Sequence, residues 1–246
     1  GSLLSFVTGI GIFVTVFLTP LFLAQVRAFS SLQIGIALLS VGAFQLIALC
    51  AYAFAARYVS MRALLVFGLI CFGLGCYLYT PITHDWGWQE LLLPQALRGI
   101  GQQFSVPPIV TMALGSLPQS RLKSASGLFN LMRNLGGAIG IAVSATMLND
   151  RLNFHYLRLN EHVSAGEPQV ASLLDRQAAY WGSVAGNTLN TAQAGLANLH
   201  RLIYREALTL TYADAYYALS LCFVVALLAV VFSKPITLNA PPPDAH

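Results

Sequence analysis

Hydrophobic residues run along this chain in long stretches that polar residues interrupt only briefly. No Asp, Glu, Lys or Arg occurs in the segments 1–26, 28–56, 63–84, 99–120, 134–149 and 215–233. A helix crosses the hydrocarbon core of a bilayer with about 20 apolar residues. The pattern therefore predicts an all-α polytopic membrane protein with six transmembrane helices, over residues 3–25, 32–56, 63–79, 91–114, 124–148 and 212–232.

The connection between the fifth and sixth predicted spans, residues 148–211, is much longer than the others. It carries five basic and five acidic side chains and is rich in Gln, Asn and Ala. Apolar residues recur in it near helical spacing, at Leu189, Leu196, Leu199 and Ile203. We therefore predict two or three short helices that form an external cap. The chain then divides into five spans within 1–147, the external loop 148–211, and the last span with a tail within 212–246.

Composition also places the chain in the membrane class. Charged residues make up 9% of it, against about 25% in soluble domains. A soluble surface of this size cannot be covered with so few charges, so the deficit argues against a soluble enzyme and excludes a disordered chain. The formal net charge of +4 is spread along the sequence without a Lys/Arg cluster. No nucleic-acid surface is therefore expected.

Lys and Arg residues near the ends of the spans predict the orientation. One side of the membrane would carry five of them: Arg57, Arg62, Arg121, Lys123 and Lys234. The other side would carry Arg27 alone in its short loops. Because cytoplasmic loops are enriched in Lys and Arg, the C-terminus is predicted in the cytoplasm and the loop 148–211 outside. The outer interface would then hold an aromatic belt of Trp86, Trp88, Tyr212, Tyr216 and Tyr217.

Neither a metal site nor a catalytic site is expected. The four cysteines lie in apolar runs, the five histidines lie mostly in or near the loops, and no pair has the spacing of a metal motif. A membrane-embedded hydrolase would need paired Asp residues, a Ser/His pair or a His/Glu metal site within the spans. The predicted spans contain none of these constellations, so we expect a protein that is not an enzyme and uses no cofactor.

The fifth predicted span has one polar, small-residue face. At about 100° per residue, one side of the helix collects Ser126, Asn130, Arg133, Asn134, Gly136, Gly137, Gly140 and Ser144. The spacing of Gly136 and Gly140 permits the close approach of another helix. Helix packing without any further function would be enough to explain the glycines. An arginine inside the bilayer additionally needs a partner or a water-filled cavity.

The fourth predicted span repeats this pattern on a narrower arc, with Gln95, Arg98, Gly101, Gln102 and Ser105. Arg98 could instead extend to the outer interface. No acidic residue lies deep enough in the predicted spans to pair with either intramembrane arginine, so their partners would be a substrate, protonated groups or an absent part of the protein. Together with Gln45 of the second span, the residues predicted to line a cavity are Gln45, Gln95, Arg98, Gln102, Asn130, Arg133 and Asn134.

Two stretches resemble a known family. The run RLKSASGLFNLMRNLGGAIG over 121–140 resembles the signature of EmrB/QacA-type drug:proton antiporters in the major facilitator superfamily. The stretch QALRGIGQ over 95–102, followed by Pro107 and Pro108, is similar to an earlier helix of the same group. A long external loop before the last helix is similar as well. The resemblance implies the C-terminal six-helix half of a fourteen-helix transporter.

Several residues take an implied role from this resemblance. Arg98 would match, by internal repeat, an embedded arginine of the N-terminal half, and Gly136, Gly137 and Gly140 would match its glycine-rich antiporter motif. Arg57 and Arg62 keep the two basic ends of the cytoplasmic loop motif of the superfamily. Ala56 stands where that motif often has an aspartate, which weakens the case for a conformational latch. The proton-accepting residues would belong to the missing half.

The resulting hypothesis is a proton-driven exporter of hydrophobic or amphipathic compounds in the bacterial inner membrane. Its implied partners are these substrates, protons and the missing N-terminal half. The external cap would either dock a periplasmic membrane-fusion protein that works with an outer-membrane channel, or serve as a lid or stabilising cap without a partner. Substrate would bind between the two halves near the bilayer midplane. The alternative is a membrane scaffold, in which the glycine face and the external cap only hold other subunits.

Overall fold

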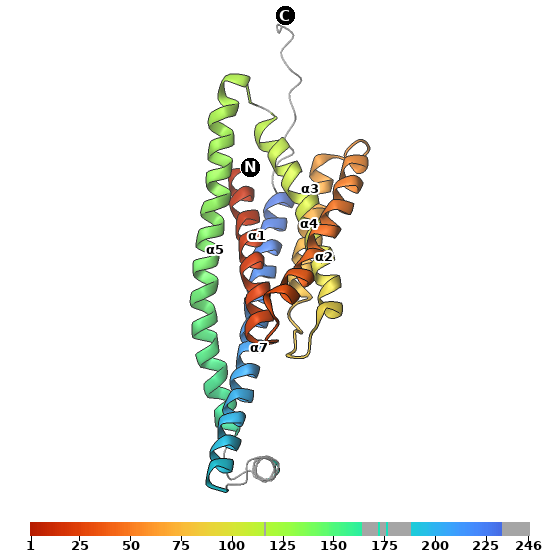
Figure 1. Ribbon diagram of the computed structural model, residues 1–246. Coiled ribbons are helices and arrows are strands. Elements are labelled where there is room, and N and C mark those ends of the chain that lie inside the picture. The colour runs from red at the N-terminus through yellow and green to blue at the C-terminus, as the bar shows by residue number, and fades with distance from the viewer. Residues whose placement is uncertain (116, 164–171, 173–175, 177–187, 233–246) are drawn as a thin grey trace, which may run out of the picture.

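The computed structural model describes residues 1–115, 117–163, 172, 176 and 188–232, and its described elements are all α-helices (Figure 1). They are α1 (Ser2–Gln25), α2 (Ser31–Ala55), α3 (Met61–Tyr77), α4 (Trp88–Leu114), α5 (Gln119–His162) and α7 (Thr188–Phe232). The predicted all-α fold class is confirmed. Serine side chains begin two of the helices: Ser30 accepts a hydrogen bond from the N–H of Gln33 at α2, and Ser60 accepts one from Ala63 at α3.

The helices form a bundle whose order in space differs from their order in the chain. α1 packs against α5 and α7, α3 packs against α4 and α7, and α2 lies on α4. The main core joins aliphatic and aromatic side chains of α1, α3 and α7, including Leu18, Phe22, Phe72 and Phe223. The rings of Phe72 and Phe223 stack with their centroids 4.3 Å apart. α1 therefore holds the centre of the bundle, and α2 and α5 lie at its flanks.

Four of the helices are long and apolar enough, by length and composition, to cross a membrane. These are α1, α2 and the segments Ser120–Glu161 of α5 and Gly195–Phe232 of α7. α3 is apolar but has 17 residues, and α4 does not reach the same apolarity. The lower apolarity of α4 comes from polar residues such as Gln95 and Arg98. These two side chains are buried against neighbouring helices and do not face lipid.

The described helices continue through both ends of the predicted external loop 148–211 and are longer than the short helices expected there. α5 continues without a break beyond residue 148 to His162, and α7 begins at Thr188, well before residue 212. The segment 148–162 contains neither Gly nor Pro, so nothing in its sequence ends the helix. The prediction that 148–211 is helical holds for 148–162 and 188–211. The segments 164–171, 173–175 and 177–187 lie outside the described residues.

The extensions of α5 and α7 run side by side beyond the rest of the bundle (Figure 1). His155 Nε2 lies 2.8 Å from Asp214 Oδ2, and Tyr156 Oη lies 3.1 Å from His200 Nδ1. The ring of Tyr156 also packs edge-on against Tyr204. These contacts join side chains that are 44 to 59 residues apart in sequence. The segment that extends beyond the bundle is therefore an antiparallel helix pair.

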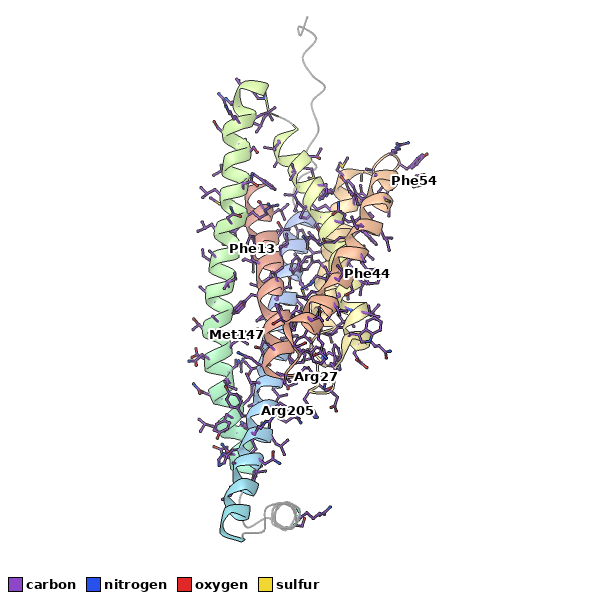
Figure 2. The ribbon with its side chains drawn as sticks, in the orientation of Figure 1. Phe13, Arg27, Phe44, Phe54, Met147 and Arg205 are labelled. Atoms are coloured by element: carbon purple, nitrogen blue, oxygen red, sulfur yellow. The ribbon has the colours of Figure 1, made fainter. Side chains whose placement is uncertain are left out.

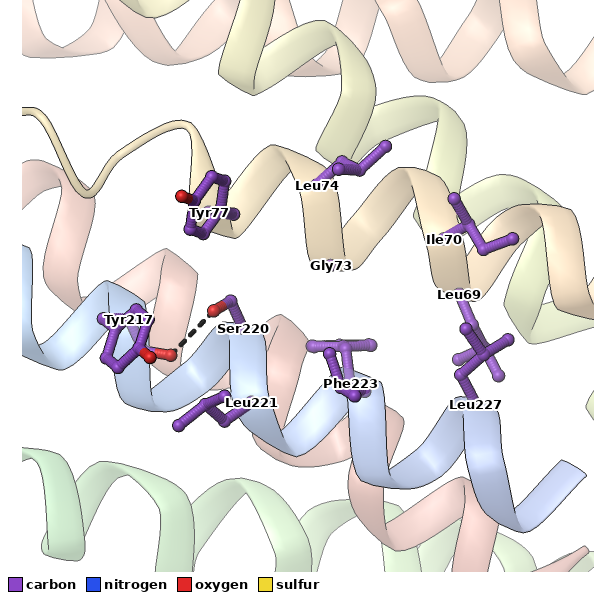
Figure 3. A pocket seen from close by; sticks show the side chains of 11 residues that line it. Leu69, Ile70, Gly73, Leu74, Tyr77, Tyr217, Ser220, Leu221, Phe223 and Leu227 are labelled. Carbon is purple, nitrogen blue, oxygen red and sulfur yellow. Dashed lines mark hydrogen bonds between the residues drawn. The ribbon is translucent and has the colours of Figure 1, made fainter.

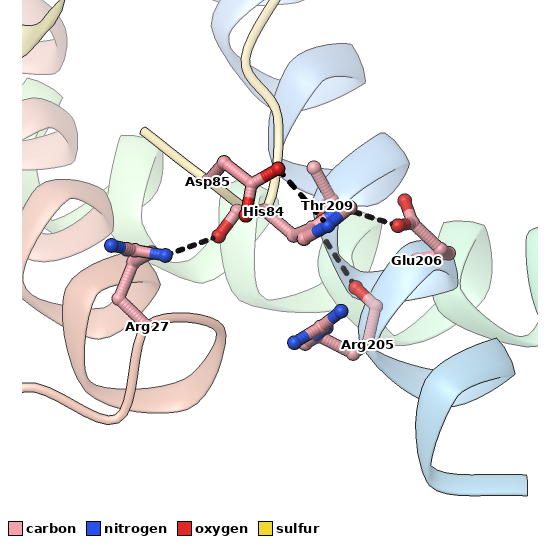
Figure 4. A network of polar contacts seen from close by, with 6 residues as sticks. All are labelled: Arg27, His84, Asp85, Arg205, Glu206 and Thr209. Atoms are coloured by element: carbon pink, nitrogen blue, oxygen red, sulfur yellow. Dashed lines mark hydrogen bonds and ion pairs between the residues drawn. The ribbon is translucent and has the colours of Figure 1, made fainter. Parts of the chain in front are cut away.

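A polar network ties the same end of the bundle together (Figure 4). Arg27 Nη1 donates a hydrogen bond of 2.8 Å to the carbonyl oxygen of His84. The imidazole of His84 pairs with Glu206 of α7 at 2.5 Å and with Asp85 at 3.3 Å. The connections α1–α2 and α3–α4 are thereby fixed to α7. Phe54 lies near the C-terminal end of α2. Figure 2 shows that Arg27 and Arg205 lie toward the opposite end of the bundle.

The orientation can be tested by labelling. In a background without the native cysteines, Arg158→Cys on the extension of α5 should react with a membrane-impermeant maleimide added to intact spheroplasts. Arg121→Cys at the opposite end of α5 should react only after the membrane is opened, because the Lys and Arg residues near it favour the cytoplasmic side. Both positions are exposed, so access alone decides the result. The opposite labelling pattern would reverse the predicted topology.

Candidate functional site

The first polar group of interest lies inside the bundle. α4 buries Gln95 and Arg98, whose residues are 0% and 4% exposed. Gln95 Oε1 lies 2.6 Å from the hydroxyl of Ser40 on α2, and Arg98 Nη1 donates a bond of 3.3 Å to Thr19 Oγ1 on α1. Arg98 therefore points toward α1 and does not extend to the outer interface.

Close packing of α3 on α4 brings this polar group into the core. A Cβ added to Gly101 would lie 2.7 Å from Phe72 Cα, and one added to Gly75 would lie 2.8 Å from the Arg98 backbone nitrogen. Both distances are shorter than van der Waals contact allows, so only glycine fits at these crossings. The small residues bring the two backbones together, and the polar side of α4 is enclosed as a result.

Two tyrosines complete the cluster, and neither was among the residues predicted to line a cavity. Tyr216 Oη lies 2.7 Å from Thr19 Oγ1. Because the Thr19 hydroxyl donates to the Thr15 carbonyl oxygen at 2.8 Å, Thr19 accepts and Tyr216 donates. The ring of Tyr79 stacks on Tyr216 with a centroid distance of 4.2 Å. The four side chains of Thr19, Tyr79, Arg98 and Tyr216 thus form a buried polar cluster.

The prediction of an outer aromatic belt is wrong for two of its tyrosines. Tyr212 and Tyr216 are fully buried, whereas Tyr217 is exposed. Tyr212 donates a hydrogen bond to Gln25 Oε1 at 2.8 Å and packs edge-on against Phe22. A signal was present in the sequence, since Tyr212, Tyr216, Leu219 and Phe223 follow helical spacing. That spacing favours one buried face over a ring around the helix.

The second polar group lies on α5, next to the interface with α1. Gly136, Gly137 and Gly140 are buried against α1. A Cβ added to Gly136 would overlap the carbonyl oxygen of Phe6, and one added to Gly9 of α1 would overlap the carbonyl oxygen of Arg133. The two helices therefore approach each other through glycines on both sides.

The amides of α5 lie outside this interface. Asn130 and Asn134 are exposed and lie one turn apart, while Arg133 is half-buried beside the α1 contact. Among the described residues, none of these three side chains makes a hydrogen bond or ion pair. Leu128, Leu131, Leu135, Ile139 and Val143 are exposed further around the helix. The free surface of α5 thus has a polar edge and a broad apolar side.

The predicted cavity residues fall into separate groups. Gln95 and Arg98 lie within the bundle, and Gln45 and Gln102 are partly exposed on α2 and α4. Gln45 lies beside Gly99 of α4. Asn130, Arg133 and Asn134 are on α5, and no hydrogen bond within the described residues connects them to α4. Among the described helices, the seven residues are therefore spread over two flanks and the interior.

The two arginines of the cytoplasmic loop motif have different environments. Arg57 is exposed. Arg62 Nη2 donates to the carbonyl oxygens of Val230 at 2.8 Å and Val231 at 2.9 Å. These carbonyls belong to the last turn of α7, where a cation is favourable because the final carbonyl groups lack helical partners. Arg62 therefore anchors the start of α3 to the end of α7.

An apolar groove of about 360 Å³ lies between α3 and α7 (Figure 3). Its lining includes Leu69, Ile70, Gly73, Leu74, Tyr77, Tyr217, Ser220, Leu221, Phe223, Val224 and Leu227. The hydroxyl of Ser220 is directed to the Tyr217 carbonyl oxygen at 2.7 Å, so it offers little polarity to the groove. None of the predicted cavity residues lines it. The groove therefore belongs to the apolar outer surface of the bundle.

The sequence profile of the Major Facilitator Superfamily matches residues 1–159, which cover α1 to α4 and most of α5. The chain belongs to this superfamily. Membership in the major facilitator superfamily and the apolar helices together make the chain a multi-pass membrane protein and indicate a transporter rather than an enzyme.

Individual relatives cover nearly all of this superfamily member. It is 28% identical over 237 residues to the Colistin resistance protein EmrB of Acinetobacter baumannii, covering 95% of this chain and 45% of the relative. It is 26% identical over 225 residues to the Multidrug export protein EmrB of Escherichia coli K12, covering 91% and 42%. The Fatty acid resistance protein FarB of Neisseria gonorrhoeae is 25% identical over 224 residues, covering 90% and 42%. The chain thus spans less than half the length of these relatives.

Proposed function

We propose that this chain forms the C-terminal six-helix half of a proton-coupled multidrug exporter in the bacterial inner membrane. The substrates would be hydrophobic or amphipathic compounds. The names of the relatives from Acinetobacter, Escherichia and Neisseria support export and resistance. The observation that carries the proposal is the free surface of α5, where Asn130 and Asn134 are exposed beside a tightly packed, glycine-based contact with α1.

The polar edge of α5 would face the translocation pathway. Exposed amides in a membrane span are costly against lipid and are usual against a water-filled cavity. Asn130, Arg133 and Asn134 would line this cavity from α5, while Gln45 and Gln102 would line it from α2 and α4. The other wall would come from the second half, as in transporters whose substrate sites lie at a repeat interface near the bilayer midplane. Gln95 and Arg98 would support the wall from behind.

Proton uptake would occur outside this chain. Among the described residues, the acidic groups lie at the outer end: Asp214 pairs with His155 and Arg151, and Glu206 pairs with His84. A group that exchanges protons during transport should lie within the membrane and change its surroundings. We therefore assign proton coupling to the other half of the exporter.

The outer pair of α5 and α7 would bind a periplasmic partner. The pair extends beyond the bundle and exposes Phe154, Leu157 and Tyr204. Such an extension is unnecessary for connecting two neighbouring spans, which a few residues can do. We infer that a periplasmic membrane-fusion protein docks on this helix pair and connects the exporter to an outer-membrane channel.

Cysteine accessibility tests the cavity. Asn130→Cys and Asn134→Cys, each in a background without native cysteines, should react fully with a hydrophilic maleimide because a thiol must reach water to ionise and react. A bound substrate should slow both reactions. Ile139→Cys, on the apolar side of the same helix, is the matched control and should remain unlabelled. If positions 130 and 134 were as unreactive as 139, the polar edge would be dry, and the scaffold alternative would be favoured.

A further inference from the structure

The apolar groove between α3 and α7 has a defined length along the two helices (Figure 3). Its lining runs from Leu69 to Tyr77 on α3 and from Tyr217 to Leu227 on α7. At 1.5 Å per residue, these stretches measure about 12 and 15 Å. One leaflet of a bilayer contributes half of a hydrocarbon core that is about 30 Å thick. The groove therefore extends over the depth of a single leaflet.

The groove is also narrow. Gly73 has no side chain to fill it and lies against α7, since a Cβ there would be 3.2 Å from Phe223 Cβ. The volume of about 360 Å³, spread over this length, corresponds to a mean cross-section of about 25 Å². An α-helix with its side chains is about 10 Å across, or roughly 80 Å² in cross-section. The groove therefore admits one extended hydrocarbon chain and is too narrow for a helix.

The two ends of the groove differ in polarity. Leu69 and Leu227 lie at one end, and Tyr77 and Tyr217 lie at the other. The two tyrosines are 52% and 46% exposed, and within the described part of the chain neither phenol forms a hydrogen bond. Tyrosines of membrane proteins are enriched at the level of the lipid headgroups, where the ring is in an apolar layer and the hydroxyl meets polar groups. The tyrosine end therefore suits the ester and phosphate oxygens of a lipid.

We propose that one acyl chain of a phospholipid occupies this groove, in the leaflet next to the α3–α4 connection. The phenols of Tyr77 and Tyr217 donate hydrogen bonds to its ester or phosphate oxygens. The hydrophobic effect does not favour the groove over the surrounding lipid, because both are apolar. The lipid is held instead by van der Waals contacts with the walls and floor of the groove and by the two phenols. It completes the packing of α3 on α7 and is not a transported substrate.

Native mass spectrometry of the purified full-length protein in detergent, titrated with phosphatidylethanolamine, tests this site. One lipid should bind saturably to the wild type. Val224→Trp places an indole ring in the groove and displaces on the order of ten carbon contacts or more, so it should weaken lipid binding about tenfold or more. Val225→Trp is the matched control, because Val225 is the next residue of α7, is 66% exposed and does not line the groove. It should bind the lipid as the wild type does.

Removal of the phenol hydroxyls tests the polar end separately. The double variant Tyr77→Phe, Tyr217→Phe keeps the walls of the groove and loses both hydrogen bonds, so it should bind phosphatidylethanolamine about tenfold more weakly. Tyr58→Phe, at the opposite end of α3, is the matched control. Its ring is 75% exposed and lies outside the groove, so its lipid binding should not change.

Four results would overturn the proposal. The first is a wild-type protein that binds no lipid saturably. The second is equal lipid binding by Val224→Trp and Val225→Trp, which would place the lipid elsewhere. The third is a wild-type dimer that Val224→Trp dissociates, which would assign the groove to a second copy of the chain. The fourth is unchanged binding by the double phenylalanine variant, which would refute the contacts of the two phenols. None of the predicted cavity residues lines the groove, so these results leave the proposed transport function untouched.

Discussion

Gly136→Ala should strongly destabilise the protein, because the added methyl group has no space. A Cβ at this position would overlap the carbonyl oxygen of Phe6 and lie 2.9 Å from its carbonyl carbon. Backbone atoms cannot rotate away, so α1 and α5 would have to separate along the whole contact. Overpacking of this kind costs about 1–3 kcal/mol or more. Gly9→Ala should have the same effect, since its Cβ would lie 2.9 Å from the carbonyl carbon of Arg133.

The glycines of α5 should differ in a defined order. Gly140→Ala would meet Val14 Cγ2 at 2.8 Å and the α1 backbone at Ile10, so it should also be damaging. Gly137→Ala would meet the ring of Phe13 at 2.5 Å. Phe13 is 37% exposed and its ring can turn outward, so Gly137→Ala should be the mildest of the three. The unfolding temperature of each variant measures the series. It is determined by heating the protein in detergent and monitoring the loss of its monodisperse peak in size-exclusion chromatography.

Gly127→Ala is the matched control on the same helix. Nothing lies within 4 Å of a Cβ at this position. Replacing an unconstrained helical glycine with alanine stabilises a helix by about 0.5–1 kcal/mol, so Gly127→Ala should be neutral or slightly stabilising. An unfolding temperature for Gly136→Ala equal to that of Gly127→Ala would show that α1 and α5 do not pack as closely as described here.

The 246-residue chain by itself should transport nothing. Its free surfaces on α2 and α5 would form one wall of a cavity, and the chain spans less than half the length of its relatives. Alternating access needs two bodies that rock against each other around the substrate. Liposomes that contain only this chain, with a pH gradient across the membrane, should therefore move a fluorescent hydrophobic probe at the rate of empty liposomes.

Co-expression with the segment that corresponds to the other half of the relatives should restore transport. The restored rate should fall to background when the pH gradient is dissipated by an ionophore, because export is proposed to be driven by protons. Ile139→Leu, a conservative change on the apolar side of α5, should transport normally in the restored pair. Gradient-driven transport by residues 1–246 alone would disprove the half-transporter proposal.

Local sequence determined the class of this protein and most of its helices. The charge-free apolar runs predicted helical segments that the structure contains, because spanning helices satisfy their own backbone hydrogen bonds and need only a sufficient run of apolar residues. The helical spacing of Gly136 and Gly140 likewise placed them on one face without any knowledge of α1. The ends of α5 and α7 were not predictable in this way, since the decline of apolarity near residues 148 and 212 marks a change of environment and not the end of a helix.

Tertiary structure alone decided which polar residues meet. Thr19 and Tyr216 are 197 residues apart, and Thr19 and Arg98 are 79 apart, so no local spacing could bring them together. Tyr79 lies just beyond α3, and its buried stack with Tyr216 depends on how α3 crosses α7. The sequence by itself determined that Arg98 is an unusual charge within an apolar segment. Only the packing of four helices decided that this charge is enclosed, because burial depends on neighbours that the chain supplies from distant positions.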